Sequence, residues 1–141
     1  MKKLAQISLL LIVLILTSCD DKKVVETNSI KGTWRCEDYS TLTGRRVYMV
    51  DIERSNNDTT KYILSNFNNE GVDNEGTYRF VTSHLNKFTL TIDPSQQIFG
   101  TQTLIKSGTG VVSANFARIE LSYKILVGKS DYEIQAVYTR P

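Results

Sequence analysis

The chain has few of the residues that perform catalysis or join distant segments covalently. Its 141 residues include one histidine, two cysteines, two prolines and one tryptophan. A single histidine excludes a histidine-rich metal site, and two cysteines exclude a framework of several disulfides. A folded domain in this chain must therefore be stabilised by its hydrophobic core.

The two residues that could still support chemistry are His84 and Cys36. His84 lies in the segment Thr82-Ser83-His84-Leu85-Asn86, between two predicted strands, where we expect an exposed turn and no catalytic partner. Cys36 follows Trp34 by two residues, so the two side chains share one strand face, and we expect a buried thiol rather than a nucleophile. We accordingly predict that the protein is not an enzyme and needs no cofactor or metal.

The charge balance excludes another class of function. Lysine and arginine total 17, aspartate and glutamate total 15, and the formal net charge is +2. Lys2 and Lys3 belong to a segment that we expect to be removed, and without them the mature chain carries 15 basic and 15 acidic residues. No Lys/Arg-rich block remains in the mature sequence to bind nucleic acid.

One long apolar run is present, at the N-terminus. Lys2 and Lys3 precede an apolar stretch from Leu4 to Leu16, which is shorter than the roughly 20 apolar residues that span a bilayer. The run ends in Leu16-Thr17-Ser18-Cys19, which resembles the lipobox of bacterial lipoproteins. That resemblance implies cleavage before Cys19, a diacylglycerol thioether on its sulfur, and commonly an acyl chain on its new amino group. The alternative is that Cys19 is an ordinary thiol, behind a secretory signal or within an uncleaved helical anchor.

The lipobox divides the chain into three parts. Residues 1–18 form the predicted signal peptide, residues 19–29 a lipid-anchored tether without a sustained apolar period, and residues 30–141 a single domain. Two or three acyl chains hold a protein durably on a membrane. We therefore expect localisation to the cell envelope, anchored through Cys19, at the periplasmic or surface face of the outer membrane.

From Ile30 onward the pattern is that of β-structure. Short runs rich in Val, Ile, Thr, Tyr and Phe alternate with clusters of Asn, Asp, Gly and Ser. The clearest strand is Phe116 to Val127, in which every second residue is apolar. No segment after the signal has an apolar period of 3.6, so we predict an all-β fold with little or no helix. Eight to ten strands joined by short turns favour an antiparallel meander closed into a barrel, which removes the exposed sheet edges.

A three-residue motif gives this barrel a family resemblance. Gly32-Thr33-Trp34 is similar to the Gly-x-Trp signature of lipocalins and related calycin barrels. The resemblance implies that Gly32 and Trp34 close one end of the barrel and that Arg140 packs across the indole ring. The domain also resembles small Bacteroidota lipoproteins with lipocalin-like barrels. The segments that carry this second resemblance are Ile30 to Trp34, Ile63 to Phe67, Gly108 to Gly110 and Ala136 to Thr139.

Two functions of different class remain open. In the first, the barrel binds a small apolar ligand in its interior, as the calycin resemblance implies. In the second, the domain is a non-catalytic interaction or accessory module that binds an envelope protein or glycan on its outer face or loops. The predicted interior residues for the first are Trp34, Tyr48, Val50, Phe88, Leu90, Ile119, Leu121 and Tyr123.

Two polar segments carry further hypotheses. The loop Asn68 to Gly76 has several oxygen-bearing side chains that could bind Ca²⁺, but a solvated hairpin loop explains the same residues and is favoured. Asp58-Thr59-Thr60 resembles the O-glycosylation sequon of exported Bacteroidota proteins. That resemblance makes Thr59 a candidate glycan site in an exposed turn.

Overall fold

The computed structural model describes residues 29–141, and this part of the chain is almost entirely β-structure. The strands are β1 (Gly32–Ser40), β2 (Gly44–Arg54), β3 (Lys61–Ser65), β4 (Phe80–Asn86), β5 (Thr89–Ile92), β6 (Gln96–Gln97), β7 (Thr103–Val112), β8 (Arg118–Val127) and β9 (Ser130–Thr139). Helix within the described residues is confined to one 3₁₀ turn, η1 (Phe67–Asn69). No helix in this part of the chain has the length and apolarity to cross a membrane. The prediction of an all-β fold is confirmed.

The strands form one antiparallel sheet that closes on itself. The sheet order is β5-β4-β3-β2-β1-β9-β8-β7-β6, and an additional pairing of β5 with β7 joins its two ends. Eight strands complete the barrel, and the two-residue β6 pairs with β7 as an extra strand. The prediction of a closed barrel is therefore confirmed, and closure leaves the sheet without two free edges.

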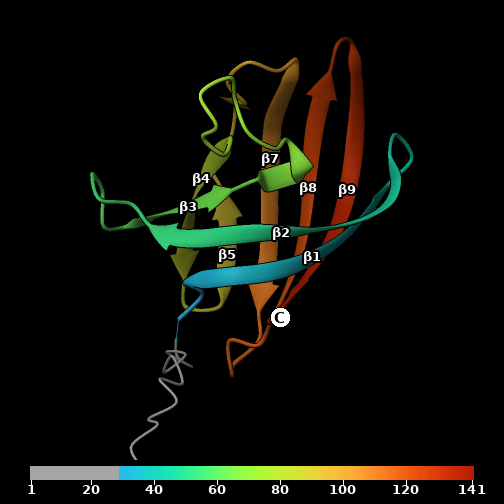
Figure 1. Cartoon of the computed structure of the whole chain (residues 1–141). Helices are drawn as coiled ribbons and strands as arrows, with labels where there is room; N and C mark the ends of the chain where they lie inside the picture. The colour runs from blue at the N-terminus through green and yellow to red at the C-terminus, as the bar shows by residue number, and fades with distance from the viewer. Residues whose placement is uncertain (1–28) are drawn as a thin grey trace, which may run out of the picture.

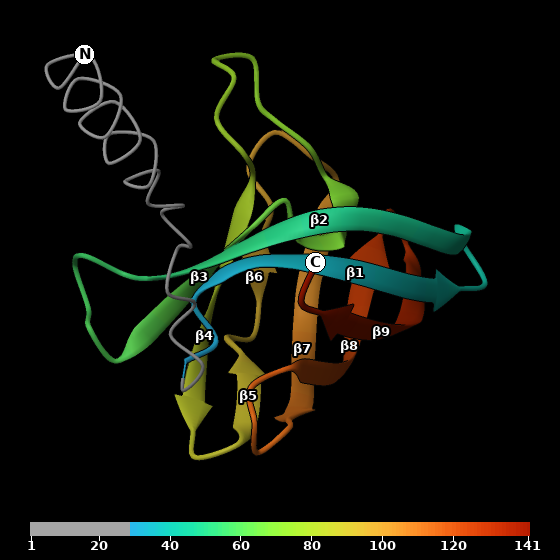
Figure 2. The ribbon, with the colours of Figure 1, turned by 60° about the horizontal axis from the view of Figure 1, so that its bottom comes forward.

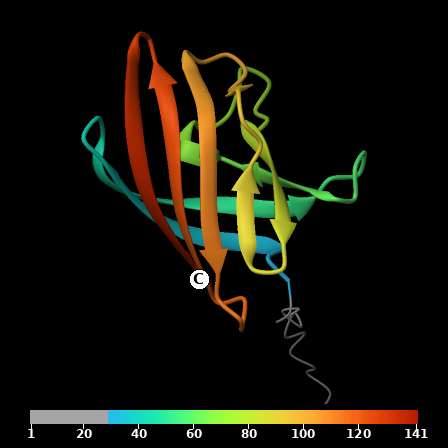
Figure 3. The ribbon, with the colours of Figure 1, turned by 180° about the vertical axis from the view of Figure 1, so that it is seen from behind.

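The barrel is flattened, with two groups of strands that run in different directions. In Figure 1, β1 and β2 run across the view while β7, β8 and β9 run along it. Figure 2 shows β1 and β2 passing over the ends of β8 and β9, and Figure 3 shows β9, β8, β7, β5 and β4 side by side from behind. Because β1 and β9 cross, they pair over five residues only, from Arg35 with Thr139 to Tyr39 with Gln135.

Alternation of side chains separates the interior from the outer face. In β8, Ile119, Leu121, Tyr123 and Ile125 are buried, whereas Arg118 is exposed. Their partners in β7 and β9 continue the apolar layer across the sheet, because directly opposed residues point to the same face. A bulge between Ile105 and Ser107 shifts the alternation of β7 by one residue, so Thr103 and Ile105 are buried before it and Gly110 and Val112 after it.

A 3₁₀ turn follows β3 directly. β3 ends at Ser65, and the chain turns through Asn66 and Asn68, which have φ values of 60° and 56°. Asparagine adopts this left-handed conformation more readily than most residues. The turn carries the buried side chains of Phe67 and Asn68 between β2 and β8, where they contact residues from both strands. η1 therefore occupies the interior at one end of the barrel.

Candidate functional site

The structure buries seven of the eight residues that were predicted to face the interior. Their exposed fractions are 8% or less, and they belong to one continuous hydrophobic cluster. The seven are Trp34, Tyr48, Val50, Leu90, Ile119, Leu121 and Tyr123. Their burial shows where these side chains lie, and their role toward a ligand stays a prediction.

Phe88 is the exception, and its interpretation as an interior residue is wrong. Lys87 has a φ of 54° and Phe88 lies in the turn before β5, so the strand begins only at Thr89. The Phe88 side chain is 43% exposed and packs against the ring of Phe116, with 5.8 Å between the centroids. Phe88 thus lies in the turn that joins β4 to β5, two residues before the buried Leu90.

The predicted contact between Arg140 and Trp34 is present. The guanidinium carbon of Arg140 lies 4.0 Å from the centroid of the indole ring, and Trp34 is fully buried. Two further hydrogen bonds fix the guanidinium, to the carbonyl oxygens of Lys31 at 2.8 Å and Ser29 at 2.6 Å. Gly32 is needed there because its φ is 114° and an added Cβ would lie 3.0 Å from Arg140. The final residues of the domain thus hold its first residues in place.

Removal of the Arg140 side chain is expected to weaken this closure. The Arg140→Ala variant loses a cation–π contact and two hydrogen bonds, and we expect the free energy of unfolding to fall by about 1–2 kcal/mol. Urea denaturation followed by the fluorescence of Trp34, the single tryptophan, measures the change directly. Arg54→Ala is the matched control, because the exposed Arg54 also lies over an aromatic ring, that of Tyr62. An equal loss in both variants would contradict a specific role for Arg140.

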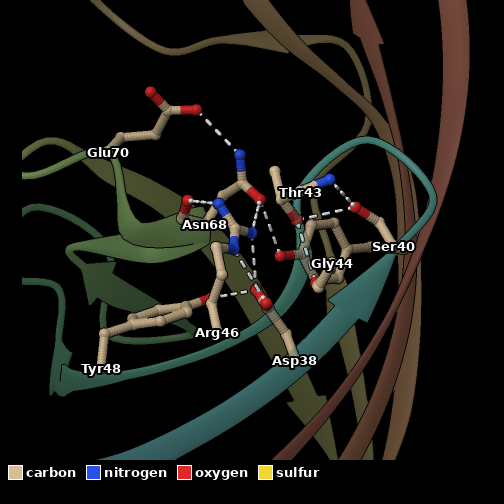
Figure 4. Close-up of polar contacts among 9 residues, drawn as sticks. Asp38, Ser40, Thr43, Gly44, Arg46, Tyr48, Asn68 and Glu70 are labelled. Atoms are coloured by element: carbon tan, nitrogen blue, oxygen red, sulfur yellow. Dashed lines mark hydrogen bonds and ion pairs between the residues drawn. The ribbon is translucent and has the colours of Figure 1, made fainter.

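A polar cluster fills the interior near the hairpin that joins β1 and β2. Asp38 is buried and accepts two hydrogen bonds from Arg46, at 2.9 and 2.7 Å, and one from Tyr48 at 2.7 Å. Arg46 also donates to the carbonyl and side-chain oxygens of Asn68 in η1, at 3.1 and 2.8 Å. Tyr123 donates to the same side-chain oxygen from β8, at 3.1 Å. Figure 4 shows the Arg46 guanidinium between Asp38 and Asn68.

The polar ends of the predicted ligand-binding tyrosines are therefore engaged within the protein. Tyr48 donates to Asp38 and Tyr123 to Asn68, and the ring of Tyr123 packs on Phe67 with 4.6 Å between centroids. Burial raises the pKa of both phenols far above the ordinary value, so both remain protonated donors at any physiological pH. This part of the interior is a packed, hydrogen-bonded core.

Cys36 behaves as the sequence predicts, as a buried thiol. It is fully buried, and burial raises the pKa of the thiol to about 11. Because the thiolate is the reactive form, very little reactive sulfur is present near pH 8. We expect a colorimetric thiol reagent at pH 8 to leave Cys36 unmodified in the folded protein and to modify it fully in denaturant. Rapid modification of the folded protein would contradict the buried assignment.

His84 lies in a strand rather than in the predicted turn. It is in β4, where it projects to the outer face and its imidazole Nδ1 lies 2.5 Å from a carboxylate oxygen of Asp93. Partial burial raises the pKa of Asp93, but hydrogen bonds from Thr82 and Lys61 outweigh this effect and hold the pKa below its ordinary value. The neighbouring hydroxyl of Ser83 points into the barrel instead, so these residues form a surface ion-pair network and not a catalytic triad.

The loop between η1 and β4 has the geometry of an ordinary turn. Gly71 and Gly76 have φ values of 67° and 80°, and Asp73 accepts hydrogen bonds from the amides of Glu75 and Thr77, each at 2.9 Å. Within residues 29–141, no three His, Cys, Asp or Glu side chains are grouped closely enough to hold a metal ion. The carboxylate of Asp73 is thus used by the backbone of its own loop.

A hollow on the outer face lies where β1 and β9 cross. Its volume is about 410 Å³, and its lining residues come from the first two strands, β1 and β2, and the last two, β8 and β9. Three arginines border it, with side-chain exposures of 45% for Arg35, 67% for Arg45 and 50% for Arg118. The remaining lining residues are Glu37, Asp38, Tyr39, Gln135, Val137 and Thr139. We call this hollow the crossing groove.

The crossing groove was not predicted from the sequence. Arg35, Glu37 and Tyr39 alternate with buried residues and so were recognisable as outward-facing. The pairing of β1 with β9 joins residues about a hundred positions apart, and no local pattern records it. Only a prediction of the barrel register would have placed Gln135 and Val137 beside them.

Two remaining predicted sites have different positions. Thr59 is exposed in the turn between β2 and β3, where the hydroxyl of Thr60 donates to Asp58 at 2.6 Å. That position is accessible, as a glycan site requires, and the modification stays a prediction. Cys19, with the signal peptide and the tether up to residue 28, lies outside the described residues.

Comparison with known proteins places the chain in no family. No protein-family model matches it, and no curated protein matches it. A crystal structure that resembles it is that of a structural-genomics protein of unknown function from Bacteroides ovatus, at 2.40 Å resolution. The TM-score is 0.42 and the sequence identity 14%, over 77% of this chain and 40% of that one. The chain thus matches less than half the length of that protein.

Proposed function

We propose that this chain is a lipid-anchored, non-catalytic binding protein of the bacterial cell envelope, whose lipocalin-like barrel binds its ligand or partner on the outer face. The anchor is argued from the resemblance of Leu16 to Cys19 to a lipobox, and a lipid on Cys19 would hold the barrel about ten residues from the membrane. An extended tether of that length reaches about 35 Å at most. The domain would therefore act close to the membrane surface.

One observation carries the choice of the outer face. The residues that could bind a ligand in this end of the interior contact each other and η1, whereas the crossing groove offers about 410 Å³ lined by arginines and an exposed tyrosine. Tyr39 is 57% exposed, and tyrosine and arginine are enriched at the centres of contact sites. These features support a surface binding function.

Binding of a small apolar ligand in the interior is the second candidate, and one observation favours it. The hydroxyls of Ser83 and Tyr138 are buried and have no hydrogen-bond partner among residues 29–141. Unpaired buried hydroxyls cost free energy, and a polar atom of a ligand could satisfy them. Both residues face the barrel interior.

Site-specific photo-crosslinking distinguishes the two surfaces. The full chain is produced in its own host with a photoreactive phenylalanine analogue in place of Tyr39 in the crossing groove, and in a second strain in place of Val111. Val111 is the control because it is 64% exposed on the outer face of β7. We expect a discrete adduct from position 39 and none from position 111. Equal adducts at both positions, or none at position 39, would count against the proposal.

A further inference from the structure

The charges that border the crossing groove do not balance. Arg35, Arg45 and Arg118 contribute three positive charges, and two carboxylates lie with them on the outer face, Glu37 in the lining and Glu120 beside Arg118. Glu37 lies 2.7 Å from Arg45 and 3.6 Å from Arg35. The carboxylate of Asp38 points inward and pairs with Arg46. Three guanidiniums therefore face two carboxylates, which leaves one positive charge in excess at the groove.

The three guanidiniums retain hydrogen-bond donors for a ligand. The hydrogen bonds of Arg45 and Arg118 use their Nε atoms, toward Glu37 at 2.7 Å and Glu120 at 2.8 Å. Each guanidinium has five N–H groups, so the terminal groups of both side chains remain directed to solvent. Pairs of such groups match the oxygens of a carboxylate or phosphate, and the match is specific to arginine.

The three arginines come from three different strands. Arg35 lies on β1, Arg45 on β2 and Arg118 on β8, and the crossing of β1 with β9 brings the three together. The backbone of the barrel fixes their Cα positions, so little backbone ordering is needed when a ligand binds. Tyr39 and Val137 add an aromatic ring and an apolar side chain to the same hollow.

We infer that the crossing groove binds an oxyanion-bearing organic ligand, with its carboxylate, sulfate or phosphate group between the arginines and its organic body against Tyr39 and Val137. This inference rests on the proposed outer-face function and specifies the class of ligand. Gln135 and Thr139, which line the groove, supply neutral polar groups for the rest of the ligand. Because the contact depends on exposed charges, binding weakens as salt is added.

An NMR titration of the full chain in non-ionic detergent micelles tests the inference. The probes are phenyl phosphate, inorganic phosphate as the anion alone, benzoate as a carboxylate, and benzyl alcohol as the neutral body. We expect phenyl phosphate and benzoate to shift the side-chain Nε–H signals of the three arginines and the amides of Gln135 and Val137, with affinity in the millimolar range for fragments of this size. Inorganic phosphate is expected to shift the same signals more weakly.

Charge-removing variants identify the residues that hold the anion. Arg45→Gln and Arg118→Gln are each expected to weaken phenyl phosphate binding about tenfold, because each loses a charge-assisted contact. Arg54→Gln is the control, since it removes the same charge at the other end of β2 and is expected to leave binding unchanged. Equal weakening in all three variants would show non-specific attraction and overturn the inference.

The remaining outcomes separate this inference from the proposed function. If benzyl alcohol shifts the groove signals and the anions do not, the oxyanion inference fails and outer-face binding stands. If no probe shifts the groove signals, the inference is overturned. If the probes instead shift interior signals such as the methyl groups of Ile119 and Leu121, the proposed function fails as well. Scattered shifts at every exposed arginine indicate an adventitious ion only, which also overturns the inference.

Discussion

Replacing Asp38 with alanine is expected to lower the free energy of unfolding by about 3–5 kcal/mol, because it leaves Arg46 without its partner inside the barrel. The Asp38 side chain is fully buried and that of Arg46 is 19% exposed, so water can replace the lost carboxylate only poorly. Tyr48 loses its acceptor at the same time. Urea denaturation of the full chain in detergent, followed by tryptophan fluorescence, gives the change in stability.

Two variants make the Asp38 result interpretable. Glu37→Ala removes the adjacent carboxylate, which pairs with an exposed arginine, and is expected to change stability far less than Asp38→Ala because solvent screens that pair. Replacement of both members of the buried pair, Asp38→Leu with Arg46→Met, is expected to recover most of the lost stability, because no uncompensated charge remains. A small effect of Asp38→Ala, or no recovery in the double variant, would contradict the account of the polar cluster.

Gly110→Ala is expected to lower the free energy of unfolding by about 3 kcal/mol, because β7 and β8 would have to separate at this point. A Cβ atom at Gly110 would overlap the carbonyl oxygen of Glu120 and lie 2.9 Å from the Cα of Leu121. Both are backbone atoms of the paired strand, so no side-chain rotation relieves the overlap. The same urea denaturation measures the effect.

Thr109→Ala is the control for Gly110→Ala. Thr109 is exposed on the same strand, and its replacement changes only strand propensity and surface area, at a cost below about 1 kcal/mol. If the two variants lose equal stability, the close approach of β7 and β8 is not what Gly110 provides. If Gly110→Ala has no effect, the strands must be able to separate more freely than their register indicates.

The sequence predicts the fold well where one strand face is buried. Period-2 alternation in Arg118–Val127 identifies the inner face of β8, and closure follows because an antiparallel meander of this size would otherwise keep two open edges. The alternation of apolar and polar residues is interrupted in β4, where the polar Ser83 faces the interior and His84 faces the solvent. A polar residue at an inward position hides the pattern, and this is why the sequence indicates a turn at His84.

The candidate site is only partly predictable. Trp34, Gly32 and Arg140 are identified because a short motif carries them, and their contact is present in the structure. The polar cluster depends on η1, whose left-handed asparagines bring Asn68 beside Arg46, and no periodicity records such a turn. The crossing groove depends on the register between the first and last strands, which is a property of the closed barrel alone.

The end of the interior beside η1 is filled by protein side chains, whereas free polar groups lie on the outer face. Residues that would form a cavity in a ligand-carrying barrel are used here for packing and hydrogen bonding, through Tyr48, Tyr123 and η1. The free donors and the exposed aromatic ring lie on the outside, at Arg45, Arg118 and Tyr39. A ligand that binds there exchanges with solvent directly and needs no opening of the barrel.

Native mass spectrometry of the full chain, purified gently from the membranes of its own host, tests whether the barrel interior holds a ligand. We expect a folded species whose mass equals that of the polypeptide with its covalent modifications, and the same mass after denaturation. A stoichiometric apolar molecule that accompanies the folded chain and is released on denaturation would contradict the account. It would show that the interior, and not the crossing groove, is the binding site.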